Sequence, residues 1–198
     1  MELSILNIRL MSYFMPKSDF EVYCFAHNKS CLPLILETLK KNQIKRIHIL
    51  ENKIEMSGVS IYDFNKQFFE KNGITVVLIP YNEDIIQTKI ESEIILKWFS
   101  KNNVKKLVVV CPIFHILRAS MTIISSVIDK NYSIEVIPLS SKVKDWGVKY
   151  ITHQGKNENN IWNLTQDEIK RVKIYQEKGD IKENQEIFNY LLKQHTHK

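Results

Sequence analysis

One short segment of the sequence carries two side chains that could do chemistry together. His115 and Arg118 lie three positions apart in the segment FHILRA (114–119), where the residues favour a helix, so both side chains share one helix face. A histidine can move a proton near neutral pH, and an arginine can hold a phosphate or carboxylate through two hydrogen bonds. An arginine in so apolar a helix also needs a partner. A polar pair that satisfies loop carbonyls is the alternative, but the pattern favours a functional pair.

A second segment, TKIE at 88–91, offers a hydroxyl and a carboxylate at the start of another apolar helix. Glu91 could act as a base or accept a hydrogen bond from a ligand hydroxyl, with Thr88 positioning the site. The same spacing is also that of a capping box, which satisfies backbone N–H groups and needs no substrate. The sequence favours neither interpretation over the other.

A third candidate follows the first predicted strand. Lys29 and Ser30 lie where nucleotide-binding α/β proteins often carry glycines, and their side chains could contact an anion. A solvated turn followed by a helix cap is the more common role of such a segment. The loop holds no glycine that would let the backbone approach a phosphate closely.

The elements that must position these residues alternate between short β-branched runs and longer amphipathic ones. The predicted strands are 21–26, 46–50, 74–79, 106–111 and 133–138, and the predicted helices between them are 32–41, 61–71, 89–100 and 114–128. This alternation predicts an α/β, Rossmann-like three-layer sandwich with a mostly parallel sheet of about five strands. Ligands of such sheets bind outside the carboxyl ends of the strands, where all three candidate segments fall.

The last part of the chain has a different pattern. Residues 1–198 are predicted to form one domain, in which 142–198 is an extension whose helices pack on the domain or on a partner. We expect a polar loop at 156–160, a capping box at 165–168 and helices at 166–178 and 184–194. Apolar residues at helical spacing predict that the last helix is buried on one face. These are Ile181, Ile187, Phe188, Leu191 and Leu192.

Composition narrows the classes of function. The net charge of +6 is spread along the chain, which argues against a nucleic-acid partner and favours an anionic small-molecule ligand. The apolar stretch 107–128 contains Arg118, which is costly in a bilayer, so we expect a strand and a helix rather than a membrane span. The start of the chain lacks the features of a signal peptide, and the three cysteines suit a reducing, cytoplasmic compartment. The histidines and cysteines form no metal-ligand pattern, and His48 is predicted to lie in the core.

The region 74–140 resembles the SanA/YdcF/ElyC-like domain, a bacterial family of unknown function. The resemblance rests on the T-x-x-E helix start at 88–91, the strand LVVVC at 107–111, the F-H-x-x-R-A element at 114–119 and a strand ending at Pro138. The segment 168–181 is similar to the closing helix of some members. The family's glycine-rich turns are absent, and Gln87 replaces its asparagine. The resemblance implies a Rossmann-like fold and a pocket for a nucleotide-like, S-adenosylmethionine-like or polyprenyl-phosphate-like ligand.

These observations lead to two hypotheses about function. In the first, the chain is a YdcF-like protein that binds a phosphate- or nucleotide-bearing small molecule, as a transferase, a hydrolase or a protein without catalysis. Arg118 then holds the anionic group, His115 is the acid or base, and Glu91 orients a group or accepts a proton. In the second, the chain is a non-catalytic module that docks a protein partner through its C-terminal helices. The sequence leaves the cofactor, the substrate and homo-oligomer formation open.

Overall fold

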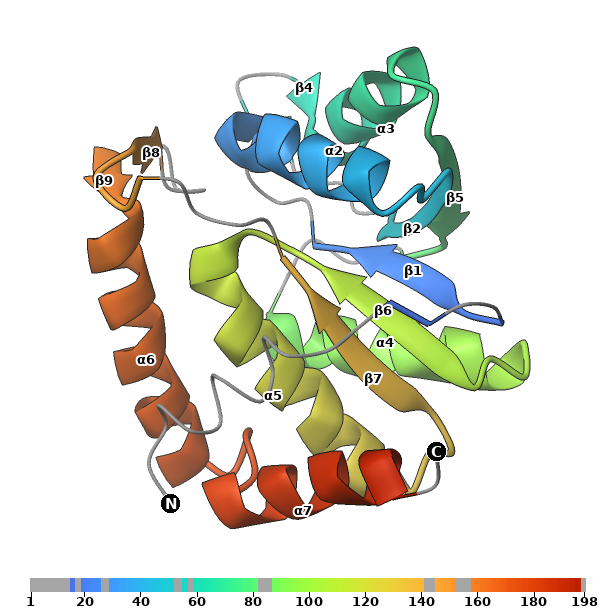
Figure 1. Ribbon diagram of the computed structural model, residues 1–198, viewed down its shortest axis with the longest axis vertical. Helices are drawn as coiled ribbons and strands as arrows, with labels where there is room; N and C mark the ends of the chain where they lie inside the picture. Colours follow the sequence, from blue (N-terminus) through green and yellow to red (C-terminus); the bar gives the residue numbers. More distant parts are fainter. Residues whose placement is uncertain are drawn as a thin grey trace.

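The computed structural model describes residues 15–16, 19–25, 29–51, 55–56, 59–81, 87–140, 145–151 and 158–196. These residues form a five-stranded sheet with helices on both faces (Figure 1). Across the sheet the strands are β5 (Thr75–Ile79), β2 (Arg46–Leu50), β1 (Glu21–Cys24), β6 (Lys106–Val110) and β7 (Glu135–Leu139). Every neighbouring pair is parallel. The predicted Rossmann-like α/β fold is therefore confirmed.

Four helices connect these strands and cover the two faces of the sheet. One face packs against α2 (Leu32–Lys41) and α3 (Ile61–Lys71), and the other against α4 (Thr88–Lys101) and α5 (Ile113–Lys130). The 3₁₀ turn η1 (Lys29–Cys31) precedes α2. The chain changes from one face to the other between β5 and β6, and the order of the strands reverses between β1 and β6. In doubly wound sheets such a reversal opens a crevice at the carboxyl ends of the strands.

The central strand β6 explains why the sequence folds this way. Its residues from Leu107 to Val110 are fully buried, because β6 has strands on both sides and helices on both faces. A continuous β-branched run suits such a position, where no side chain faces water. On β1 the alternation of the side chains is visible: Val22 and Cys24 enter one core, and Tyr23 enters the other.

The C-terminal helices pack against α5 and contribute to its hydrophobic core. In Figure 1, α6 (Ile161–Glu177) runs beside α5, and α7 (Asn184–Thr196) crosses the far end of α5. Ile181, Ile187 and Leu191 are buried, whereas Leu192 stays 39% exposed. The Tyr190 hydroxyl donates to the Ile134 carbonyl over 2.7 Å and accepts from the Val136 amide over 3.0 Å. The last helix therefore packs on the domain, as its apolar spacing predicted.

Two short hairpins were not predicted. One is formed by β3 (Glu55–Met56) and β4 (Val59–Ser60), and the other by β8 (Lys149–Ile151) and β9 (Glu158–Asn160). The prediction of a polar loop at 156–160 is wrong over 158–160, while residues 156 and 157 lie outside the described ranges. Asparagines are uncommon in strands, so the composition of this segment gave no strand signal.

The predicted capping box at 165–168 is also wrong. Helix α6 begins about a turn earlier, where the Asn160 side chain accepts from the Asn163 amide over 2.8 Å. The Thr165 hydroxyl lies inside the helix and donates to the Ile161 carbonyl over 2.8 Å. Glu168 therefore has no capping role at the start of α6.

The apolar stretch 107–128 is divided between β6 and α5, as predicted. In the described ranges no helix has the length and apolarity to cross a membrane.

Candidate functional site

The starts of α4 and α5 bring the first two predicted segments together. Both helices follow strands of one parallel sheet, so both begin at its carboxyl edge, and they pack side by side. His115 lies in the first turn of α5 and Arg118 in the next. Arg118 Nη1 donates to Thr88 Oγ1 over 2.6 Å, which joins the two helices.

Glu168 on α6 completes this cluster, which we call the Glu168 cluster: His115, Arg118, Glu168 and Arg171. The carboxylate accepts on both oxygens. Oε2 contacts Arg118 Nε and lies 3.1 Å from His115 Nδ1, and Oε1 lies 3.3 Å from Arg118 Nη2 and 2.7 Å from Arg171 Nη1. A carboxylate has about four lone-pair positions, so these contacts fill the acceptor capacity of Glu168.

The charges of the cluster follow from this geometry. Burial alone would raise the pKa of Glu168, but the charges and hydrogen bonds of His115 and Arg118 outweigh it and hold that pKa well below its ordinary value. Glu168 is therefore ionised at neutral pH. Two arginines face this single carboxylate, so the cluster retains a net positive charge even when His115 is neutral. Such an excess favours an anion nearby.

A small hollow with a cavity volume of about 30 Å³ opens to solvent beside Arg118. It is lined by Gln87, Thr88, Lys89, Arg118, Thr122, Tyr175, Asp180 and Ile181. Lys89 Nζ lies 2.8 Å from Asp180 Oδ1, and the two side chains are 36% and 33% exposed. The Arg118 guanidinium lies 5.8 Å from the centre of the Tyr175 ring, which gives the arginine a cation–π contact on this side.

Glu91 lies deeper than this hollow. Glu91 is 1% exposed, and Tyr23 is equally buried. The hydroxyl of Tyr23 donates to Glu91 Oε1 over 2.5 Å. Burial, and then the charge and hydrogen bond of Glu91, raise the pKa of Tyr23 well above its ordinary value, so Tyr23 stays protonated as the donor. Glu91 therefore lies in the core, one helix turn beyond Thr88.

Aromatic rings connect the Tyr23–Glu91 pair with the Glu168 cluster. The Phe25 ring meets the Tyr23 ring edge-on at 5.0 Å, and it meets the His115 ring edge-on at 5.8 Å. The capping-box alternative at 88–91 does not hold, because Gln87 caps α4 without a side-chain hydrogen bond. Thr88 and Glu91 instead contact Arg118 and Tyr23.

The third predicted segment lies in the other layer. Ser30 is part of η1, which leads into α2, and its hydroxyl lies 4.0 Å from the Cys31 sulfur. The backbone of Lys29 belongs to η1, while its side chain lies outside the described part of the structure. His48 is buried as predicted, with Nδ1 at 3.3 Å from the Val22 carbonyl oxygen.

Sequence reasoning missed the residues that α6 and the following turn contribute. The sequence pattern places Glu168 in a helix cap and gives Tyr175 and Asp180 no role in the site. Only one feature of the sequence pointed towards Glu168: an arginine in so apolar a helix requires a partner. This requirement does not show that the partner is a carboxylate fifty positions further along the chain. In the described ranges no three His, Cys, Asp or Glu side chains are placed to hold a metal ion.

No family model, curated protein or solved structure matches the chain. The resemblance to the YdcF-like family therefore stays a prediction, as do the roles given to His115, Arg118, Glu91 and Thr88. The geometry defines what this region can do chemically. It can attract an anion to Lys89 and Arg118, and it can hold a histidine against an ionised carboxylate.

Proposed function

We propose that this chain is a YdcF-like protein that binds a phosphate- or nucleotide-bearing small molecule at the hollow beside Arg118. The observation that carries the proposal is the convergence of Lys89, Arg118 and Thr88 at the start of α4. Both cations line an opening to solvent, and the side chain of Gln87, the residue before α4, makes no capping hydrogen bond to the described part of the helix. The backbone N–H groups and the helix dipole at a helix start favour negative charge at such a position.

The energetics of the two cations suit ligand exchange. The Lys89–Asp180 pair is about one-third exposed, and surface ion pairs contribute about 0–1 kcal/mol, so an anionic ligand can replace Asp180 at low cost. Arg118 is different, because its side chain is 12% exposed and Glu168 and Thr88 hold it in place. A preorganised arginine beside an adaptable lysine can receive an anion without a large loss of side-chain entropy.

The size of the hollow limits what enters it. Pockets for drug-sized ligands usually have about 300–1,000 Å³, so a hollow of about 30 Å³ that is open to solvent has room for an anionic group rather than for a whole nucleotide. Nucleotides, lipid phosphates and S-adenosylmethionine all carry such a group, as phosphate or carboxylate. The remainder of the ligand would lie outside the hollow.

Catalysis is the second part of the proposal. His115 contacts Arg118 and Glu168, so it lies next to the residue that would hold the anionic group. It is the side chain best placed to give or take a proton in a transferase or hydrolase reaction. Glu91 supports the site indirectly, through its buried hydrogen bond with the hydroxyl of Tyr23. A cytoplasmic location belongs to the proposal too, because Cys24, Cys31 and Cys111 are free and buried.

A thermal-shift screen tests the binding. The screen would include pyrophosphate, AMP, ATP, S-adenosylmethionine, a sugar nucleotide and a short-chain prenyl phosphate. At a hundred times its dissociation constant a ligand stabilises the fold by about 2.7 kcal/mol. In a chain of this length that corresponds to a rise in Tm of roughly 5–11 °C.

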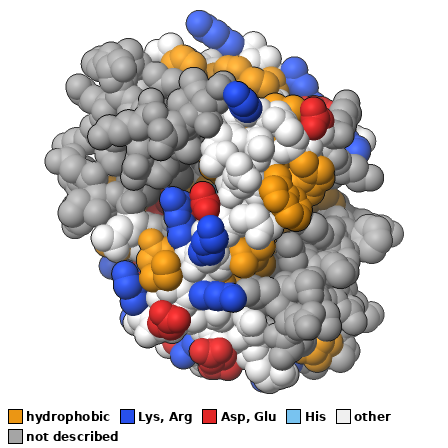
Figure 2. Space-filling view, turned by 90° about the vertical axis from the view of Figure 1, so that its left-hand side faces the viewer, with side chains coloured by type: hydrophobic (Ala, Val, Ile, Leu, Met, Phe, Trp, Pro, Cys, Tyr) orange, Lys and Arg blue, Asp and Glu red, His pale blue; other side chains and the backbone are white. Residues whose placement is uncertain are grey.

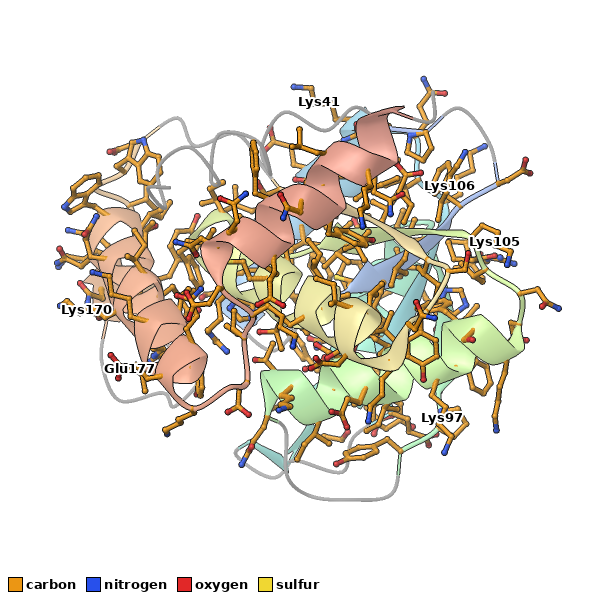
Figure 3. The ribbon with its side chains drawn as sticks, turned by 90° about the horizontal axis from the view of Figure 1, so that it is seen from below. Lys41, Lys97, Lys105, Lys106, Lys170 and Glu177 are labelled. Atoms are coloured by element: carbon orange, nitrogen blue, oxygen red, sulfur yellow. The ribbon has the colours of Figure 1, made fainter. Side chains whose placement is uncertain are left out.

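Two matched variants of α4 make the screen specific for the hollow. Lys89→Met should reduce the shift, whereas Lys97→Met should leave it unchanged, since Lys97 is exposed and points away from the rest of the domain (Figure 3). No shift with any of these compounds, or equal shifts in both variants, would contradict binding at the hollow.

A second candidate function is protein docking, and two exposed tryptophans favour it. Trp146 and Trp162 are 41% and 56% exposed, with ring centres 6.1 Å apart, and Val148 beside them is 41% exposed. Figure 2 looks onto the side of the molecule that carries α6, where hydrophobic and charged side chains both reach the surface. Exposed aromatic side chains are enriched in protein interfaces. If they bind a second copy of the chain, Trp162→Ala should shift a concentration-dependent elution volume toward the monomer.

A further inference from the structure

Among the described residues, two polar neighbours of His115 Nδ1 make opposite demands on that nitrogen. Glu168 Oε2 lies 3.1 Å away and needs a proton on Nδ1, because an ionised carboxylate only accepts hydrogen bonds. Arg118 Nη2 lies 3.2 Å away and needs a lone pair on Nδ1, because a guanidinium only donates. In a neutral imidazole, Nδ1 can satisfy only one of these two neighbours.

The surrounding contacts decide between them. Arg118 has other acceptors for its N–H groups: Nε and Nη2 reach Glu168, and Nη1 reaches Thr88. Glu168 is buried and ionised, so a lone pair on Nδ1 would face its oxygen at 3.1 Å in a region where water cannot screen the repulsion. Placing the proton on Nδ1 removes that repulsion and costs Arg118 only this one contact, while its hydrogen bonds to Glu168 and Thr88 remain.

We infer that Glu168 is a positioning residue that fixes the neutral His115 ring as the tautomer protonated on Nδ1. Nε2 then carries the lone pair, so it is the nitrogen that takes up a proton. The imidazolium that forms keeps its Nδ1–H···Oε2 hydrogen bond, and the carboxylate stabilises its charge. Carboxylates that orient a catalytic or metal-binding histidine act in this way. The use of this tautomer in catalysis rests on the proposed function, but the tautomer itself does not.

Because Glu168 orients the His115 ring, α6 is part of the site. Glu168 lies fifty-three positions from His115, and α6 packs along α5 so that the carboxylate meets the ring. Arg171, one turn further along α6, donates to the other carboxylate oxygen over 2.7 Å and holds it in place. A chain that lacked α6 would leave His115 without the group that sets its tautomer.

The tautomer can be measured directly by NMR without any ligand. A two-bond ¹⁵N–¹H correlation spectrum of the full chain, labelled on histidine and recorded at mildly alkaline pH, distinguishes protonated from unprotonated ring nitrogens. His115→Gln identifies the signals of His115 by their loss. We expect a protonated Nδ1 and an unprotonated Nε2 in the wild-type protein.

Two variants on α6 separate positioning from general effects on the helix. In Glu168→Gln the new side chain can donate as well as accept, so the His115 ring should lose its preference for the proton on Nδ1. In Glu177→Gln, the same change at an exposed position near the end of α6, the spectrum should match the wild type (Figure 3).

A wild-type ring protonated on Nε2 would overturn the inference even if Glu168→Gln did not fold. An unchanged tautomer in a folded Glu168→Gln variant would overturn it as well. Failure of every ligand in the thermal-shift screen would leave this measurement intact, so the two proposals fail separately.

Discussion

Replacing Arg118 with leucine should destabilise the fold strongly, because Glu168 would stay buried after losing its closest cation. Arg118 supplies Nε to one oxygen of Glu168 and Nη2 to the other. Removing one partner of a buried ion pair costs about 3–5 kcal/mol. The side chains of Arg118 and Glu168 are only 12% and 6% exposed, so solvent screens this interaction little. His115 and Arg171 remain near the carboxylate, which places the expected loss near the lower limit, at about 3 kcal/mol.

A double-mutant cycle measures this coupling. In a chain of about 200 residues, 3 kcal/mol corresponds to a fall in Tm of roughly 6–12 °C. Arg118→Leu, Glu168→Leu and the double variant would be compared by urea unfolding at pH 7. The double variant should lose clearly less than the sum of the two single variants, because it buries no uncompensated charge. Lys170→Leu on the outer side of α6 is the control, where the side chain is 74% exposed (Figure 3) and the change should stay within about 0.5 kcal/mol.

Two results would refute this account of the Glu168 cluster. One is a loss below about 1 kcal/mol in Arg118→Leu, which is the range of a surface ion pair. The other is strict additivity in the cycle, which would mean that Arg118 and Glu168 contribute independently.

Three further predictions concern acid, truncation and thiol chemistry. The pKa of Glu168 is lower in the folded than in the unfolded chain, so its contribution to stability is complete above the ordinary carboxyl range near pH 4.3 and is lost as the pH falls below it. Urea unfolding between pH 6 and 3 should therefore show a shallower acid loss in Glu168→Gln, and parallel curves would contradict this. Truncation after Gly179 removes three buried aliphatic side chains, each worth about 1.5–3 kcal/mol, so an unchanged melting curve would contradict the packing of α7. Burial raises the pKa of the Cys31 thiol to about 12, and burial raises those of Cys24 and Cys111 as well, so native protein at pH 8 should resist iodoacetamide, and rapid modification seen by mass spectrometry would contradict it.

The fold could be predicted from the sequence because its signals are local. The β-branched run of β6 and the helical spacing of α5 both lie within short windows, and Asn72 and Gly73 end α3 where φ of Gly73 is +79°. The hairpin of β8 and β9 could not be predicted in the same way. Its second strand consists of one acidic residue and two asparagines, and its pairing depends on a partner strand rather than on its own residues.

The candidate site was predictable only in part. His115, Arg118 and Thr88 belong to two motifs, and the parallel sheet necessarily brings the starts of α4 and α5 to one edge. Glu168 could not be found because its contacts reach fifty positions back along the chain, and its sequence neighbours imitate a helix cap. The burial of Glu91 could not be predicted either, because it depends on a hydrogen bond from the hydroxyl of Tyr23, which lies on β1.

The central claim is that an anion binds between Lys89 and Arg118, and an NMR titration tests it most directly. Pyrophosphate and AMP would be added to ¹⁵N-labelled protein while the amides of Thr88 and Lys89 and the Nε–H of Arg118 are followed. We predict saturable shifts of these three signals. We also predict an affinity about tenfold weaker in Lys89→Met, which lacks one charge-assisted hydrogen bond, and wild-type affinity in Lys97→Met. Shifts that do not saturate, or that fall on other parts of the described structure while these three signals stay fixed, would contradict the claim.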